Sequence, residues 1–134
     1  MIRSDDTGKL ILRLALGIMI LLHGIAKLTT GVGFVSRLLV AHDLPAFLAY
    51  AVFIGEILAP VLIIVGVYTR AAAWIVFIDV LVAIWLVHLK DLWLIGRGGG
   101  WAIELEGMFL FAALAIALMG AGRFSLAGSG GHLN

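Results

Sequence analysis

Long apolar runs alternate with short polar segments along this chain, and the pattern predicts four membrane-spanning helices. The apolar runs cover about residues 10–29, 46–66, 71–89 and 101–120. About 20 apolar residues are enough to cross the hydrocarbon core of a bilayer as an α-helix. Each run therefore has the length of one span, and the four runs together take up most of the 134 residues.

The segments between these runs are short. They are a polar N-terminus (1–9), a first loop (30–45), a tight turn (67–70), a Gly-rich loop (90–100) and a Gly/Ser-rich tail. In lipid every backbone polar group must be satisfied within its own helix or by a neighbour, and short connections join helices of opposite direction. We therefore expect an all-α membrane protein: one domain over residues 1–134, folded as an antiparallel four-transmembrane-helix bundle.

Two local patterns refine this expectation. Residues 33–42 in the first loop are too few to span, and their mixed polar and apolar character predicts a short helix lying in the membrane interface. The first apolar run is long, is interrupted by His23 and Lys27, and is not followed by a convincing small-residue cleavage site. We therefore expect it to be retained as a span rather than removed as a signal peptide.

The basic residues predict an orientation. One side of the predicted bundle carries Arg3, Lys9, Arg13, Arg70 and Arg123, and the other side carries Arg37, Lys90 and Arg97. Loops rich in Lys and Arg tend to stay in the cytoplasm. This bias predicts a multi-pass protein of a bacterial-type inner (plasma) membrane with both termini in the cytoplasm.

Composition and charge narrow the function classes. The chain is 63% hydrophobic and 13% charged, and its formal net charge is +1. Such a chain lacks the excess of positive charge that binds the phosphates of nucleic acid, so nucleic acid is excluded as a partner. It contains no cysteine and no histidine pair with a third ligand at metalloprotease spacing, so no metal site is encoded by motif. Redox chemistry would need an external cofactor.

Ionisable residues within the spans are the candidates for function, because they are costly in lipid and usually face a partner or a cavity. His23 and Lys27 lie four residues apart on one stripe of the first span. Glu56 is near the middle of the second span, and Pro60 four residues later cannot donate to its carbonyl group, which predicts a kink with a free acceptor. A structural alternative is that Glu56 pairs with Lys27 or His23 only to hold the helices together.

Further polar residues fall at the same level of the predicted bundle. His88 is near the outer end of the third span, and Glu104 and Glu106 are near the outer start of the fourth. Glu104 and Glu106 differ by about 200° around the helix axis, and we expect Glu104 to face the interior. His88 also has the simpler interpretation of an interfacial histidine.

Asp79 is predicted in the opposite half of the bundle from this group. It lies eight residues beyond the cytoplasmic start of the third span. Arg13 and Arg70, at that end of the predicted bundle, are its expected partners.

Several motifs together resemble the DoxX family of small four-helix integral membrane proteins, over nearly the whole chain. They are Arg13-Leu14, His23-Gly24, Lys27-Leu28, Gly55-Glu56, Gly66, Thr69-Arg70, His88, Glu104 and the ending Gly120-Ala121-Gly122-Arg123-Phe124-Ser125-Leu126. Ala121 and Ala127 stand where the family often has Pro and Asp, and Asp79 stands where an apolar residue is usual. The resemblance implies a relative of thiosulfate:quinone oxidoreductase components. Members of the DoxX family are also associated with membrane oxidoreductase complexes.

Three functions fit these observations, and whether the protein is an enzyme stays open between them. The first is a component of an oxidoreductase or respiratory-type complex that interacts with a quinone. In this hypothesis His23, Lys27 and His88 bind the ligand, and Glu56 and Glu104 form a proton relay. A bound quinone is the expected cofactor, and a partner oxidoreductase subunit donates the electrons. A haem held axially by His23 and His88 is a further option.

The other two functions need no bound redox cofactor. One is a small-solute or proton transporter or channel, active as a homo-oligomer, in which the carbonyl freed by Pro60 serves as a ligand. The other is a non-catalytic membrane scaffold or assembly protein that uses small-residue helix faces for contact. Both keep the lipid bilayer as the first partner.

Overall fold

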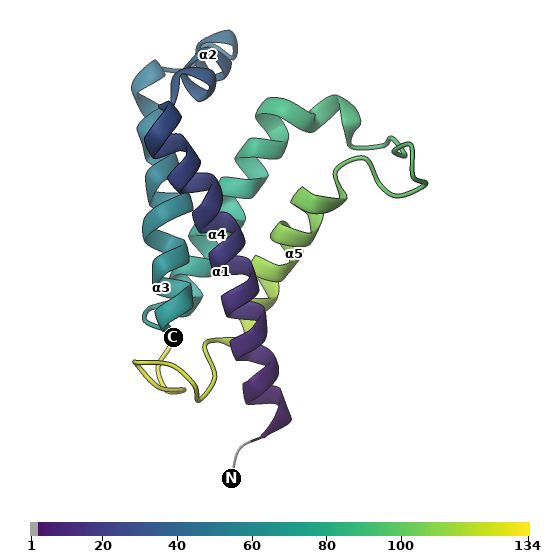
Figure 1. The fold of residues 1–134 in the computed structure, drawn as a ribbon. Helices are drawn as coiled ribbons and strands as arrows, with labels where there is room; N and C mark the ends of the chain where they lie inside the picture. The colour runs from purple at the N-terminus through teal and green to yellow at the C-terminus, as the bar shows by residue number, and fades with distance from the viewer. Residues whose placement is uncertain (1–2) are drawn as a thin grey trace.

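The computed structural model describes residues 3–134, and this part of the chain is helical, with one isolated β-bridge between Ile95 and Trp101 (Figure 1). The α-helices are α1 (Ser4–Thr30), α2 (Gly33–Ala41), α3 (Ala59–Val65), α4 (Thr69–Ala83) and α5 (Glu104–Met119). The 3₁₀ segments are η1 (Ala46–Ala51) and η4 (Leu89–Asp91), and the π-helical segments are η2 (Ile54–Leu58) and η3 (Ile84–His88). The predicted all-α class is confirmed.

Three helical stretches of the described chain are long and apolar enough to cross a membrane. They are Ser4–Thr30, Ala46–Val65 and Thr69–Asp91, with 27, 20 and 23 residues. They correspond to the first three predicted spans. The fourth predicted span, 101–120, is represented by α5, which has 16 residues and is shorter than a typical spanning helix of about 20.

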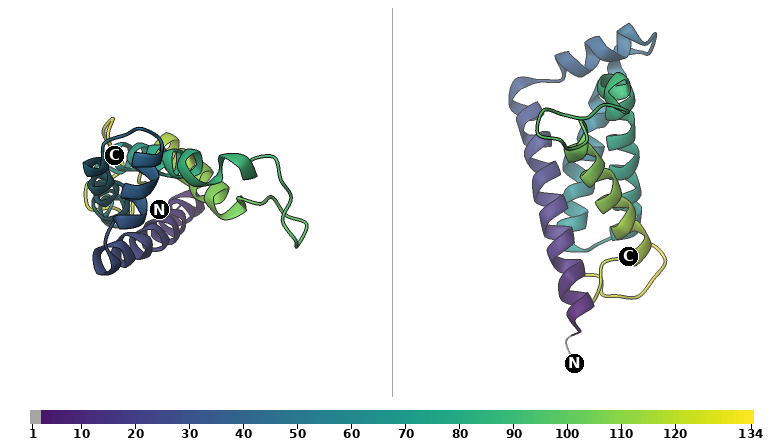
Figure 2. Two further views of the ribbon diagram at one scale, coloured as in Figure 1. Left: turned by 90° about the horizontal axis from the view of Figure 1, so that it is seen from above. Right: turned by 90° about the vertical axis from the view of Figure 1, so that its right-hand side faces the viewer.

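The ends of the molecule differ in structure (Figures 1 and 2). The start of α1, the turn between α3 and α4 and the C-terminal tail lie at one end, and α2 lies at the other. In the view of Figure 1, α4 and α5 diverge from α1 and α3 toward the α2 end. Helix α2 forms where the sequence predicts a short interfacial helix, and it crosses the end of the bundle.

Apolar side chains from four helices form the core. Leu16, Ile63, Val76 and Ile116, from α1, α3, α4 and α5, are each at most 2% exposed. Many large apolar side chains point outward instead, including Met108, which is 67% exposed. A long helix that keeps an apolar outer surface is suited to contact with lipid rather than water. The chain thus buries a narrow stripe of each helix and leaves the rest for the bilayer.

The second span is irregular where Pro60 interrupts its hydrogen bonds. Because proline has no N–H, the α-helical bond to the carbonyl of Glu56 cannot form. One residue earlier, the N–H of Ala59 donates to the carbonyl of Ile54, five residues back, in place of Gly55, four residues back. The result is the π-helical segment η2, which ends directly before Pro60. The sequence predicts a kink at Pro60, and the structure has a π turn directly before it, of the kind that is frequent at functional sites.

The C-terminal tail folds back under the helices and is held by a buried arginine of α1. Arg13 is 1% exposed, and its guanidinium donates to the carbonyl oxygens of Ile63, Ala121, Phe124 and Ile64 at 2.9, 2.9, 2.6 and 3.0 Å. A guanidinium carries five N–H donors in a fixed plane, so it can serve several carbonyl groups at once. Arg13 therefore ties α1 to the end of α3 and to the tail.

Candidate functional site

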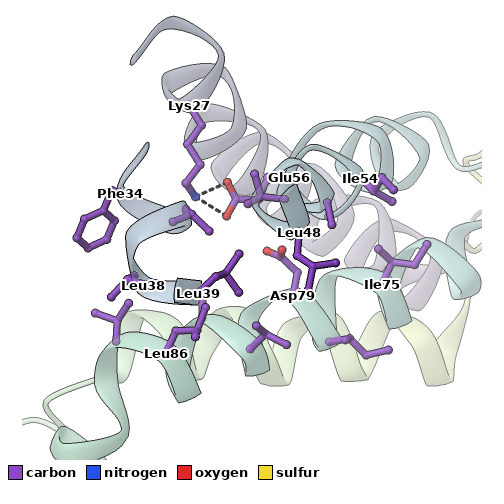
Figure 3. Close-up of a pocket in the computed structure, with 18 residues that line it drawn as sticks. Lys27, Phe34, Leu38, Leu39, Leu48, Ile54, Glu56, Ile75, Asp79 and Leu86 are labelled. Atoms are coloured by element: carbon purple, nitrogen blue, oxygen red, sulfur yellow. Dashed lines mark hydrogen bonds and ion pairs between the residues drawn. The ribbon is translucent and has the colours of Figure 1, made fainter. Parts of the chain in front are cut away.

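A pocket of about 360 Å³ lies beneath α2, between the η1–η2 segment and α4 (Figure 3). Its walls are aliphatic side chains with one aromatic ring, that of Phe34, and its charged residues are Lys27, Glu56 and Asp79. These three come from three elements: α1, η2 and α4. An apolar cavity with a few convergent polar groups is the usual form of a small-molecule site.

Lys27 and Glu56 form a close ion pair in this pocket. The Nζ atom of Lys27 lies 2.7 Å from Oε1 and 2.6 Å from Oε2 of Glu56. The two side chains are 28% and 11% exposed, respectively. A lone carboxylate at this depth would be costly, and the ammonium group compensates its charge. Of the two partners that the sequence leaves open for Glu56, Lys27 and His23, the structure has Lys27.

Asp79 of α4 lies beside the ion pair (Figure 3). Its carboxyl group packs against Gly55, where an added Cβ would come within 2.6 Å of Cγ and Oδ1. It interacts electrostatically with both Glu56 and Lys27. Gly55 therefore makes room for the second carboxyl group, and the pocket holds two carboxyl groups and one ammonium group.

The expected partners of Asp79 are wrong. Arg13 donates to backbone carbonyl groups at the other end of the molecule. Arg70 donates to the last carbonyls of α5, with 2.6 Å between Nη1 and the oxygen of Leu118. Both arginines cap carbonyl groups at helix ends, as cations near a helix C-terminus commonly do. Asp79 belongs to the same pocket as Lys27 and Glu56 instead of the opposite half.

The tight turn between α3 and α4 carries a signal that places Asp79 correctly. Glu56 lies ten residues before Gly66, which ends α3, and Asp79 lies ten residues after Thr69, which begins α4. Equal counts on both sides of a short turn bring two residues to about the same height. Counting eight residues from the start of the third span gives the depth of Asp79 in that span, but it does not relate Asp79 to Glu56 in the second span.

His23 is not part of the pocket. Its ring lies against Phe109 of α5 in a T-shaped arrangement, with 5.9 Å between the ring centroids, and the residue is exposed. Although His23 and Lys27 share one stripe of α1, Lys27 reaches η2 while His23 turns toward α5. The expected grouping of His23 with Lys27 and Glu56 does not form.

His88 belongs to a second polar cluster, between η3 and the start of α5. Its Nε2 atom lies 3.2 Å from Oε1 of Glu106, and its Nδ1 atom lies 3.6 Å from Oδ2 of Asp91. The expectation that Glu104 faces the interior is wrong, because Glu104 is exposed and its carboxyl group lies over Gly100 in the Gly-rich loop. The two glutamates point in different directions, and Glu106 is the one that meets His88.

The six polar residues that the sequence places at one level of the bundle therefore separate. Lys27 and Glu56 meet in the pocket, His88 meets Glu106, and His23 and Glu104 belong to neither pair. Within residues 3–134, no group of three or more metal-ligating side chains is arranged to hold a metal ion.

These features define an integral membrane protein with a charged site inside an apolar helical bundle. The DoxX family model matches residues 8–89, and the chain belongs to the DoxX family. The matched range contains Lys27, Glu56 and Asp79. Over 118 residues the chain is 29% identical to a protein of Bacillus subtilis (strain 168) described as "Putative oxidoreductase CatD", covering 88% of this chain and 83% of that protein. No solved structure gives a significant match to the chain.

Proposed function

We propose that this protein is the membrane component of an oxidoreductase system and that it binds a quinone in the pocket beneath α2. The observation that carries the proposal is the position of the Lys27–Glu56 pair and Asp79 on one apolar cavity of about 360 Å³. The family and the description of the Bacillus relative support an oxidoreductase-associated role.

The residues present fit a quinone. Its ring and isoprenoid tail are apolar and suit the aliphatic walls, and its carbonyl oxygens need hydrogen-bond donors. The ammonium group of Lys27 has three N–H donors, which exceeds what the two oxygens of Glu56 require. When bound, a quinone would supply a couple of two electrons and two protons. Lys27 would orient a carbonyl oxygen, and the carboxyl groups of Glu56 and Asp79 would hold and exchange protons.

The electrons would come from a partner redox protein, because the sequence contains no cysteine for a thiol or iron–sulfur centre. His23 and His88 were the expected ring-binding residues, and Glu104 an expected proton carrier. In this proposal they have no direct contact with the ligand, since none of the three lines the pocket.

We propose that α5 is a fourth, short span of an antiparallel bundle and that both termini face the cytoplasm of a bacterial plasma membrane. The absence of cysteine makes single-cysteine labelling free of background. Ser4→Cys and Ser129→Cys should react with an impermeant maleimide only after the cells are opened. Gly98→Cys, in the loop before α5, should react in intact cells. The reverse pattern would contradict the orientation, and labelling of Gly98→Cys and Ser129→Cys on the same side would contradict a fourth crossing.

The test of the function is to purify the protein in native lipid nanodiscs, extract the bound molecules and identify them by mass spectrometry. We expect a quinone in the wild type at a molar ratio near one, and its loss in Glu56→Gln and Lys27→Met. Asp43→Asn, an acid-to-amide change at an exposed position outside the pocket, is the matched control and should retain the quinone. A folded wild-type protein that neither carries nor takes up quinone would refute the proposal.

The carbonyl group that suggested transport and the small residues that suggested scaffolding both lie where α1 meets the second span. The carbonyl group of Glu56 that Pro60 leaves free faces Gly24 of α1. Gly17 and Gly24 lie where α1 packs closely against α3 and η2. Proton or solute flux in liposomes, with an empty pocket, would favour transport instead.

A further inference from the structure

Asp79 is the carboxyl group of the pocket that the ammonium group of Lys27 does not neutralise directly. Both oxygens of Glu56 lie within 2.7 Å of Lys27 Nζ, so that pair is matched in charge. Asp79 adds a second carboxyl group to the same cavity. Its carboxyl group also interacts with Glu56, and because each carboxyl oxygen has two lone pairs, Asp79 can still accept from a hydrogen-bond donor that enters the pocket.

One wall of the pocket is also part of the outer surface of the molecule. Ile54 in η2 and Ile78 and Val82 in α4 line the pocket, yet they are 50%, 57% and 44% exposed. These side chains belong to two of the stretches that are long and apolar enough to span a membrane. The wall of the pocket at η2 and α4 is therefore also a surface that faces the lipid.

We propose that the ligand is a lipid-soluble aromatic alcohol of the phenol or hydroquinone class, which enters from the bilayer between η2 and α4 and donates its hydroxyl group to Asp79. The inference rests on the proposed function and deepens it, because it makes Asp79 the residue that selects the hydroxylated, reduced form of the ligand. Lys27 and Glu56 hold the charge balance around it.

The pocket favours a neutral hydroxyl group over a cationic head group. Organic cations are usually held by several aromatic faces, and Phe34 provides the one aromatic ring among the lining residues. A hydroxyl donor satisfies the lone pairs of Asp79 without bringing such a charge.

The experiment measures equilibrium binding to the full-length protein in nanodiscs, corrected for uptake by empty nanodiscs. The probes are a decyl-substituted hydroquinone kept reduced under argon, its dimethyl ether, the corresponding oxidised quinone and a decyltrimethylammonium salt. A hydrogen bond to a carboxyl group is worth about 0.5–3 kcal/mol, from its neutral to its charged form, which converts to a preference of roughly 2–100-fold. We expect wild-type protein to prefer the hydroquinone over the dimethyl ether by at least about fivefold.

Variants at Asp79 give the decisive comparison. We expect Asp79→Leu to bind the two probes equally to within about threefold, and Asp79→Asn, which retains a neutral acceptor, to fall between the two. Asp43→Asn should keep the full preference. Where Asp79→Leu does not fold, Asp79→Asn carries the test, and an unchanged preference in that variant would overturn the inference.

The outcomes separate the two proposals. Equal binding of hydroquinone and ether by the wild type, or tighter binding of the ammonium salt, overturns the inference about Asp79. Quinone binding by the same sample leaves the proposed function standing. Failure of the hydroquinone and the quinone to bind overturns both.

The lateral entrance has its own test. We expect Ile78→Trp at the entrance to slow association of the hydroquinone severalfold, while Ile11→Trp, on an exposed position of α1 outside the pocket, leaves the rate unchanged. An unchanged association rate in Ile78→Trp would overturn entry by this route.

Discussion

Gly24 of α1 lies directly against the carbonyl group of Glu56. A Cβ atom added at Gly24 would overlap that carbonyl oxygen and would come within 2.7 Å of both the carbonyl carbon of Glu56 and Cγ1 of Ile57. The obstacle is largely backbone and cannot rotate away. The π turn before Pro60 therefore packs against Gly24. Helix α1 can approach η2 this closely because glycine has no side chain.

Gly24→Ala should destabilise the protein by about 1–3 kcal/mol, the usual cost of overpacking a close contact. It should also move Lys27 away from Glu56, because both contacts join α1 to η2. Thermal unfolding in detergent, followed by circular dichroism, measures the first effect. Gly8→Ala is the matched control in the same helix. Nothing lies within 4 Å of its added Cβ, so the melting temperature should stay the same or rise. Equal melting of both variants would contradict the close contact.

Separating Lys27 from Glu56 should be more harmful than removing both. Glu56→Gln or Lys27→Met leaves one charge without its partner, and the expected cost is about 3 kcal/mol, at the low end for buried pairs because Lys27 is 28% exposed. The double variant Lys27→Met/Glu56→Leu should recover part of that stability, since no unpaired charge remains from the pair. A double-mutant cycle from thermal unfolding checks this. Additive losses would show that the two side chains are not coupled.

Arg13→Ala should release the tail. The change removes the donors to four buried or partly buried carbonyl groups, and leaving buried polar groups unpaired costs about 1–3 kcal/mol each in proteins. Limited proteolysis followed by mass spectrometry should find new cleavage within residues 120–128. Arg37→Ala, at an exposed position of α2, should cleave like the wild type. Protection of the tail in Arg13→Ala would mean that other contacts suffice to hold it.

His88 should couple to Glu106 and not to Glu104. The Nε2 atom of His88 lies 3.2 Å from Oε1 of Glu106, whereas Glu104 lies over the Gly-rich loop. Because both partners are about 30% exposed, we expect a coupling energy of about 0.5–1 kcal/mol between His88→Ala and Glu106→Gln. The cycle with Glu104→Gln should give a value near zero. Coupling to Glu104 instead would contradict the assignment of the two glutamates.

The fold follows from sequence to the extent that hydrophobic length and proline chemistry determine it. The apolar runs predict the helical stretches because a helix in lipid must satisfy its own backbone, and Pro60 predicts the irregular turn because its nitrogen has no hydrogen. The extent of α5 was harder to predict. The sequence predicts a run over 101–120, but the loop continues to Ile103, where the bridge between Ile95 and Trp101 and the hydrogen bond from Trp101 Nε1 to the carbonyl of Leu92 hold it.

The site was predictable where residues on two helices are both costly to bury, as Lys27 and Glu56 are. It was not predictable where rotation about a helix axis decides the contact. Glu104 and Glu106 are equivalent in composition and depth, and a difference of two positions reverses which one meets His88. Asp79 is a different case, because equal counts from the turn between α3 and α4 place it at the height of Glu56.

The position of Arg13 has a consequence for the time course of assembly. Two of its acceptors, Ala121 and Phe124, follow it by 108 and 111 residues along the chain. At a synthesis rate of about 5–20 residues per second, the first helix waits roughly 5–20 s for these carbonyl groups to leave the ribosome. Until then the guanidinium of a nascent helix must be hydrated or held by other groups. The contacts that fix the tail to α1 can therefore form only after residues 121–124 have been synthesised.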